Sequence, residues 1–184
     1  MRSIQEIQLS AIFKQFKVAD FAYAILGDLT LQDLLNLALS KNKQVAFRAS
    51  WLLETIVLKE KIHLNKIHKE LILQLPIQYN WSCLRSYTKV CIQLTSRLEK
   101  DITLTAVEEE ILINCCFTYL SSAACPVAVT VNAMDVLYNL RTGHLWIQEE
   151  LLEQIDYLLK KPSPALLSRA KKIQLKLKNN KRGT

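Results

Sequence analysis

A five-position apolar pattern recurs along this chain of 184 residues. Its positions, spaced by four, three, one and three residues, fall on one stripe of an α-helix. The stripe returns at intervals of 37 to 46 residues, which predicts stacked helical hairpins that bury their apolar faces against one another. The copies are Val45, Ala49, Leu52, Leu53 and Ile56; Cys83, Tyr87, Val90, Cys91 and Leu94; Val129, Ala133, Val136, Leu137 and Leu140; and Leu166, Ala170, Ile173 and Leu177, with Gln174 in the fourth place.

Turn residues indicate where the helices of the first half begin and end. Residues 1–29 are expected to hold divergent N-terminal helices, with a break at Gly27 because glycine readily adopts the positive φ that ends helices. The first strong stripe predicts a helix over about 44–59. A partner helix near 63–74 stops before Pro76, since proline disfavours a helical conformation in the preceding residue.

The middle of the chain contains two further start positions. Asn80 is a predicted N-cap for a helix that runs from Trp81 towards Lys100, and a turn follows it. Thr105 and Glu108 have the spacing of a capping box, in which hydroxyl and carboxylate satisfy each other's free amide groups. These residues place another helix directly after 105.

In the last third of the chain, prolines mark the predicted starts of helices. Pro126 suits the first turn of a helix, and Ser163-Pro164 suits an N-cap followed by the first helical residue. Counted together, the chain predicts about nine or ten antiparallel helices and no strand, which is an all-α fold. We expect one domain over 1–179 and a disordered basic tail over 180–184.

Three segments of the striped helices resemble a known repeat class. Residues 47–54, 126–137 and 168–173 resemble the second helix of HEAT and armadillo repeats, with a small residue in each stripe and an arginine beside it in the first and third segments. Over about 30–178 the chain is similar to a small bacterial HEAT-like family of about this length. The resemblance implies a right-handed α-α superhelix, that is, a HEAT/ARM-like α-solenoid, and a non-enzymatic protein that binds or scaffolds an unknown protein partner.

The net charge of +7 is concentrated at the C-terminal end. Nine basic and no acidic residues lie from Lys160 to Thr184, so the first 159 residues carry −2. On the helix that begins at Pro164, the cations lie outside the apolar arc and should face water or an acidic partner. They are either the polar outer face of a terminal repeat or a contact for a protein or nucleic acid. The candidate contact residues are Arg169, Lys171, Lys172, Lys176 and Lys178.

The cysteines and the uncharged central stretch bear on the compartment. Five cysteines, an odd number without metal spacing, are expected to be reduced thiols in a cytoplasmic protein. The N-terminus has no apolar run typical of a signal peptide. Residues 111–134 are uncharged and nominally long enough to cross a bilayer, but Pro126 divides them, so two buried helices are the preferred interpretation.

Acid–base and metal-binding residues do not form a recognisable catalytic pattern. His63 and His68 are five positions apart, which places them on different faces of a helix and not at metal-binding spacing. His144 follows Gly143 and is expected to be a solvated turn residue. No phosphate-binding loop is possible with three scattered glycines. We therefore predict no catalytic residue, no metal site and no cofactor.

The three tryptophans leave a third hypothesis open. HEAT-like DNA glycosylases hold DNA with aromatic and basic residues, a use that Trp51, Trp81 and Trp146 could resemble. The charge of −2 over the body opposes this interpretation, because phosphate recognition needs a spread of Lys and Arg. Packing of these rings in the core or at hairpin edges is the preferred interpretation.

Overall fold

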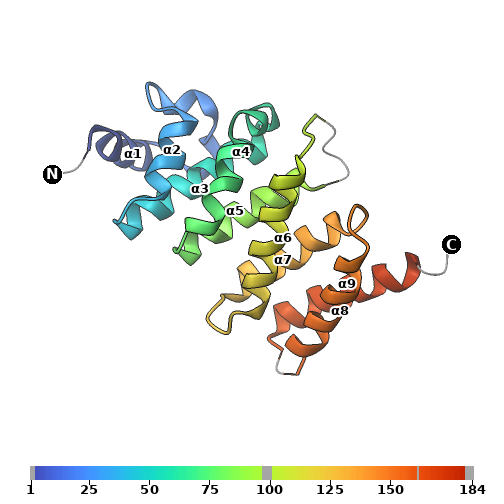
Figure 1. Ribbon diagram of the computed structural model, residues 1–184. Coiled ribbons are helices and arrows are strands. Elements are labelled where there is room, and N and C mark those ends of the chain that lie inside the picture. Colours follow the sequence, from blue (N-terminus) through green and yellow to red (C-terminus); the bar gives the residue numbers. More distant parts are fainter. Residues whose placement is uncertain (1–2, 97–100, 161, 181–184) are drawn as a thin grey trace. The chain divides into compact units, whose positions relative to one another are not determined.

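The computed structural model describes residues 3–96, 101–160 and 162–180, and only the backbone of 178–180. This part of the chain forms nine α-helices, four short 3-10 helices and no strand, which confirms the all-α class. Its contacts divide the chain into two compact units, Met1–Leu94 and Thr95–Thr184, whose helices are labelled in Figure 1. The single domain over 1–179 stays a prediction, and residues 181–184 of the expected tail lie outside the described residues.

The first unit consists of two layers of helices that follow an N-terminal helix. After short turns α2 packs on α3, and α4 packs on α5. Alternate helices also meet, because α4 contacts α2 and α5 contacts α3. The helices are α1 (Ile4–Gln15), α2 (Leu31–Ala38), α3 (Lys43–Lys59), α4 (Leu64–Gln74) and α5 (Trp81–Leu94), with 3-10 helices at Val18–Asp20, Tyr23–Leu26, Lys61–His63 and Leu75–Ile77.

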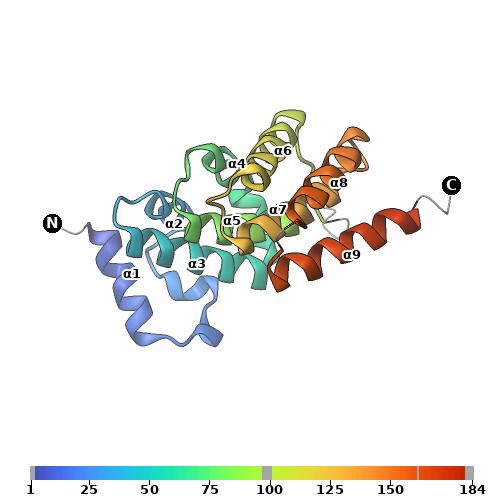
Figure 2. The ribbon, with the colours of Figure 1, turned by 90° about the horizontal axis from the view of Figure 1, so that it is seen from below.

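The second unit repeats this arrangement with two helical pairs. Helix α6 packs on α7, α8 packs on α9, and α7 contacts both α8 and α9. Figure 2 shows α8 and α9 from a second direction. The helices are α6 (Ala106–Ser121), α7 (Val127–Leu140), α8 (Trp146–Leu158) and α9 (Pro164–Asn180).

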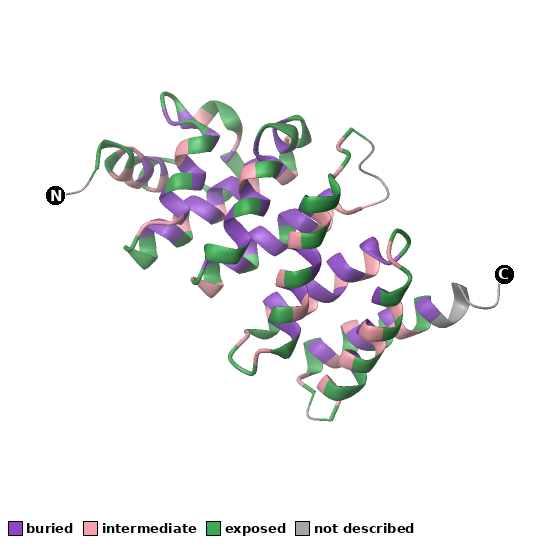
Figure 3. Cartoon of the chain, in the orientation of Figure 1, coloured by how far each residue is buried: buried purple, intermediate pink, exposed green. Residues whose placement is uncertain are grey.

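The recurring stripe is the inner face of the second helix in each pair. Every apolar stripe residue on α3, α5, α7 and α9 is buried, and Gln174 in the α9 stripe is half-buried. Figure 3 shows the long buried stretches along α3 and α5. Ala49, Ala133 and Ala170 are fully buried. A small side chain at this position lets a neighbouring helix approach closely, so the stripe sets both which face is buried and how near the helices pack.

Most predicted helix starts are confirmed by their hydrogen bonds. Thr105 and Glu108 form the capping box at α6. Asn80 Oδ1 accepts from the Ser82 amide at 3.0 Å, and Ser163 Oγ accepts from the Leu166 amide at 3.4 Å. These side chains satisfy amide groups that the first helical turn leaves free.

Two predicted boundaries are wrong by short distances. Helix α5 ends at Leu94, the last position of its apolar stripe, and does not continue towards Lys100; residues 97–100 lie outside the described residues. Thr95 and Ser96, which follow Leu94, are half-buried hydroxyl residues, and serine and threonine favour a helix less than straight-chain residues do. Pro126 is the N-cap of α7 and not part of its first turn, because its ψ of 142° is extended.

No helix within the described ranges is long and apolar enough to span a membrane. The uncharged stretch that raised this possibility is split between α6 and α7, as the position of Pro126 indicated.

Candidate functional site

The predicted basic residues lie on α9, but they do not all face solvent. Arg169 Nη1 is 2.8 Å from Asp135 Oδ2 on α7, so this cation is bound within its own unit. The Lys176 ammonium lies 5.0 Å from the centroid of the Tyr138 ring, also on α7. Lys171 and Lys172 are exposed, and the side chain of Lys178 lies outside the described residues.

Asp135 organises the charges between α7 and α9. Its carboxylate is half-buried, and the loss of solvent raises the pKa of Asp135 above its usual range. Arg169, Lys176 and Lys172 oppose this rise in the pKa because they favour the charged carboxylate. The cations predicted as partner contacts therefore also neutralise an aspartate of the preceding helix.

The aromatic ring of Tyr138 on α7 contacts two cationic side chains. The guanidinium of Arg141 lies 3.6 Å from the ring centroid of Tyr138 and also donates to the Tyr138 carbonyl. The Lys176 contact with the Tyr138 ring links α9 to α7 by cation–π attraction, whereas the Arg141 contacts lie within the C-terminal end of α7. Neither Tyr138 nor Arg141 was predicted as a contact; their three-residue spacing at the end of one helix was the available indication.

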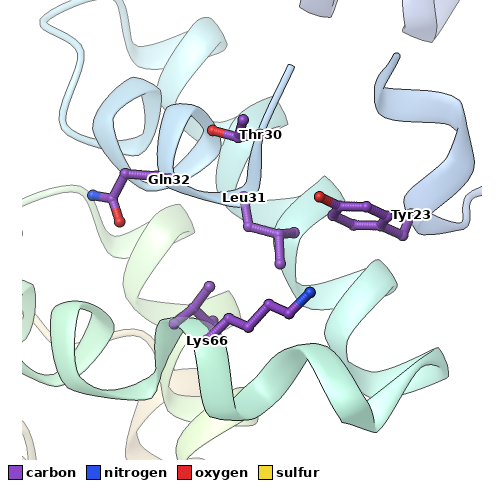
Figure 4. A pocket seen from close by; sticks show the side chains of 6 residues that line it. Tyr23, Thr30, Leu31, Gln32 and Lys66 are labelled. Atoms are coloured by element: carbon purple, nitrogen blue, oxygen red, sulfur yellow. The ribbon is translucent and has the colours of Figure 1, made fainter. Parts of the chain in front are cut away.

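A small cavity of about 180 Å³ lies in the first unit beside the 3-10 helix that contains Tyr23. Figure 4 shows the Tyr23 ring and the Lys66 side chain on two sides of Leu31. Tyr23 also stacks on His63, with ring centroids 4.2 Å apart. The cavity thus combines an apolar floor with one ammonium group at its edge.

Glu60 binds the 3-10 helix that contains Tyr23. Its Oε1 accepts from the Tyr23 amide at 2.8 Å, and its Oε2 lies 3.3 Å from His63 Nε2. The amide hydrogen bond is the main reason that the pKa of Glu60 is lowered. His63 is buried, and its Nδ1 has no hydrogen-bond partner among the described residues. Tyr23 covers one side of the His63 imidazole ring. His63 therefore helps to hold the 3-10 helix that contains Tyr23.

The remaining histidines occupy structural positions. His68 is buried, and its Nδ1 lies 3.0 Å from the Asn65 carbonyl oxygen. The expectation for His144 was wrong, because it is half-buried with Nε2 2.8 Å from Glu109 Oε2 on α6. Sequence reasoning missed this pair because the two residues are 35 positions apart.

Trp51 and Trp146 pack against other aromatic rings, as expected, but Trp146 also stays exposed to solvent. Trp51 is half-buried, with its ring centroid 5.6 Å from those of both Phe13 and Phe21. Trp146 stacks on Phe117 of α6 at 5.7 Å but remains 53% exposed. Its neighbour Leu145 is 85% exposed. The corner between α7 and α8 therefore presents two large apolar side chains to solvent, of which Trp146 was considered from the sequence and Leu145 was not.

The cysteines are all free thiols. Burial raises the pKa values of Cys83, Cys115 and Cys125, which makes these thiols poor nucleophiles at neutral pH. Cys125 lines a cavity of about 240 Å³ in the second unit, where it also accepts from Thr130 Oγ1 at 3.5 Å. The other lining residues are mainly aliphatic and hydroxyl side chains.

Within the residues whose placement is described, no group of three or more His, Cys, Asp or Glu side chains is arranged to hold a metal ion. Comparison with protein-family models, curated proteins and solved structures finds no match to this chain.

Proposed function

We propose that the chain is a non-enzymatic, cytoplasmic protein-binding module built as a right-handed HEAT-like α-solenoid. The packing of alternate helices in each unit supports this architecture: α3 contacts α5, and α7 contacts α9. The same apolar stripe occupies all four of these helices. Repeats of this kind present extended surfaces to other macromolecules, which is an argument from architecture alone.

The exposed corner at Leu145 and Trp146 is the observation that carries the proposal. Large apolar side chains that remain in solvent are common contact points of protein interfaces, and tryptophan is enriched among the residues that dominate binding energy. The Trp146 ring is fixed by Phe117, and the adjacent His144 is fixed by Glu109. A side chain held in place loses little conformational entropy on binding, so this corner is suited to anchor a partner.

Affinity purification with matched variants tests the proposal. The wild type, Leu145→Ser/Trp146→Ala and the control Ile62→Ser are compared at native salt, with bound proteins quantified by mass spectrometry. Ile62 is 77% exposed in the other unit and lies outside the proposed contact. We expect a partner that the wild type and control retain and the corner variant loses. Equal retention by all three, or turnover of a metabolite by a purified chain that retains no partner, would reject the proposal.

The exposed lysines of α9 favour a second candidate function, nucleic-acid binding. Lys171, Lys172 and Lys176 are exposed on one helix, although Lys176 also contacts Tyr138. Binding through phosphates predicts affinity that falls steeply with salt and is lost in Lys171→Glu/Lys172→Glu/Lys176→Glu. A gel-shift series with a flat salt response would reject it. Excision of alkylated bases by the purified chain would instead favour a glycosylase.

A further inference from the structure

The outward stripe of α8 combines aromatic and acidic side chains. Trp146, Glu149, Glu153 and Tyr157 follow one another at intervals of three or four residues, so they lie on one side of the helix. All four are exposed, with Trp146 at 53% and Tyr157 at 64%. The opposite side of α8 is the buried one, formed by Ile147, Leu151 and Ile155.

The carboxylates of this stripe are not neutralised by the described part of the chain. Neither Glu149 nor Glu153 forms an ion pair with another described residue. Two cations of the neighbouring helix contact α7 instead, because Arg169 binds Asp135 and Lys176 lies over Tyr138. The stripe is therefore a locally negative surface with an aromatic ring at each end.

Both rings are suited to cationic groups. Lys160 already places its ammonium 5.1 Å from the centroid of Tyr157, which shows this ring accepting a cation from its own chain. Trp146, held on one side by Phe117, offers the aromatic face that attracts cations most strongly. The carboxylates between the two rings complete a surface that favours positive charge, and its Tyr157 end already contacts Lys160.

We infer that α8 docks a basic amphipathic helix of a protein partner, an inference that rests on the proposed protein-binding function. Tyr157 lies eleven positions after Trp146, which is about 16 Å along the helix, or three turns. A partner helix lying beside α8 would place lysine or arginine at the same three- and four-residue spacing against Glu149 and Glu153. Its apolar residues would pack on Trp146 and Leu145.

Titration with a model peptide tests the charge requirement. The probe is a helical leucine–lysine peptide of about 15 residues, and its counterpart has glutamate for every lysine. Binding to the full chain is followed by the NMR signals of the three tryptophan indole groups, with Trp146 assigned through Trp146→Phe. We expect the basic peptide to shift the Trp146 signal and the acidic peptide to leave it unchanged.

Two double variants make the same change in net charge at different places. Glu149→Gln/Glu153→Gln alters the stripe, whereas Asp28→Asn/Glu110→Gln alters two exposed acidic residues outside it. Glu149→Gln/Glu153→Gln removes two exposed charge pairs with the basic peptide and should weaken peptide binding about fivefold. Asp28→Asn/Glu110→Gln should change peptide binding by less than about twofold. Equal weakening in both, equal binding of both peptides, or signal changes confined to another tryptophan would overturn the inference.

Further outcomes separate this inference from the proposed function. If Trp146→Ala abolishes retention of the natural partner while Glu149→Gln/Glu153→Gln does not, the basic-helix inference fails and protein binding stands. If neither variant affects retention, both fail. Concentration-dependent shifts of Trp146 without peptide, removed by Lys171→Glu/Lys172→Glu, would show that a second copy occupies the stripe and would also overturn the inference.

Discussion

His144 Nε2 lies 2.8 Å from Glu109 Oε2, so a residue of the α7–α8 corner is bound to the first turns of α6. Both side chains are 31% exposed, which leaves the pair partly shielded from water. The contact fixes the backbone immediately before Leu145 and Trp146. A contact between residues 35 positions apart in the sequence thus adjoins the two exposed apolar side chains.

Removal of this contact should loosen the corner more than it destabilises the protein. His144→Ala is expected to lower the free energy of unfolding by only about 0.5 kcal/mol, because partly exposed pairs contribute little. Urea denaturation measures this change. The Trp146 indole signal in NMR should broaden or shift, while that of Trp51, in the other unit, stays in place. An unchanged Trp146 signal would show that Phe117 alone fixes the ring.

Arg169 should matter more at neutral than at acidic pH. Burial raises the pKa of Asp135. A carboxyl group with a raised folded-state pKa contributes stability below its unfolded pKa, and that contribution is lost as pH rises through its folded pKa. Arg169→Gln raises the Asp135 pKa further. The substitution should therefore lower the free energy of unfolding by about 1 kcal/mol at pH 7 and by less near pH 4. Denaturant titrations at both pH values measure the difference.

The matched comparison for this prediction removes the titrating group. In Asp135→Asn, the further change Arg169→Gln should have the same cost at both pH values. A pH-dependent cost that persists without the carboxyl group would show that Asp135 is not its source.

Tyr87 should stabilise the first unit through one buried hydrogen bond. Its hydroxyl donates to Gln74 Oε1 at 2.6 Å, and both residues are buried. Tyr87→Phe leaves this acceptor unsatisfied, so the free energy of unfolding should fall by about 1–3 kcal/mol. Tyr79→Phe is the control, since Tyr79 is 67% exposed. Equal effects of the two changes would contradict a specific role for the bond.

Burial also governs the ionisation of Tyr87. It raises the pKa of Tyr87 far above that of a solvated phenol. Ultraviolet titration should therefore show a tyrosine signal of the wild type that ionises only when the protein unfolds, and Tyr87→Phe should remove that signal.

The small residue of the stripe should not tolerate enlargement. Ala170 is fully buried in α9, whereas Ala165 on the same helix is exposed. Ala170→Leu must displace neighbouring side chains and should cost about 1–3 kcal/mol. Ala165→Leu should change stability by less than about 0.5 kcal/mol. Thermal denaturation of both variants gives the comparison, and similar midpoints would show that Ala170 is not at a close contact.

The candidate site was less predictable than the helices. The cations of α9 were predicted from composition, but whether each faces solvent depends on its neighbours on α7. Asp135 and Arg169 are 34 positions apart, and no local pattern links them. For the same reason His144 was assigned to solvent, although Glu109 binds it. Pairing across such distances is set by helix packing and not by neighbouring residues.

The sequence by itself determined the all-α class, the buried stripes and most helix starts, because periodicity, capping and proline act within a few residues of the chain. Tertiary structure alone decided where α5 ends and which cations of α9 bind α7. It also decided that Leu145 and Trp146 stay exposed beside Glu149 and Glu153, which form no ion pair with a described residue. These features depend on which surfaces meet when the helices pack. Contacts between residues far apart in the sequence decide which helix surfaces pack together. Periodicity along one helix cannot specify the neighbours of that helix.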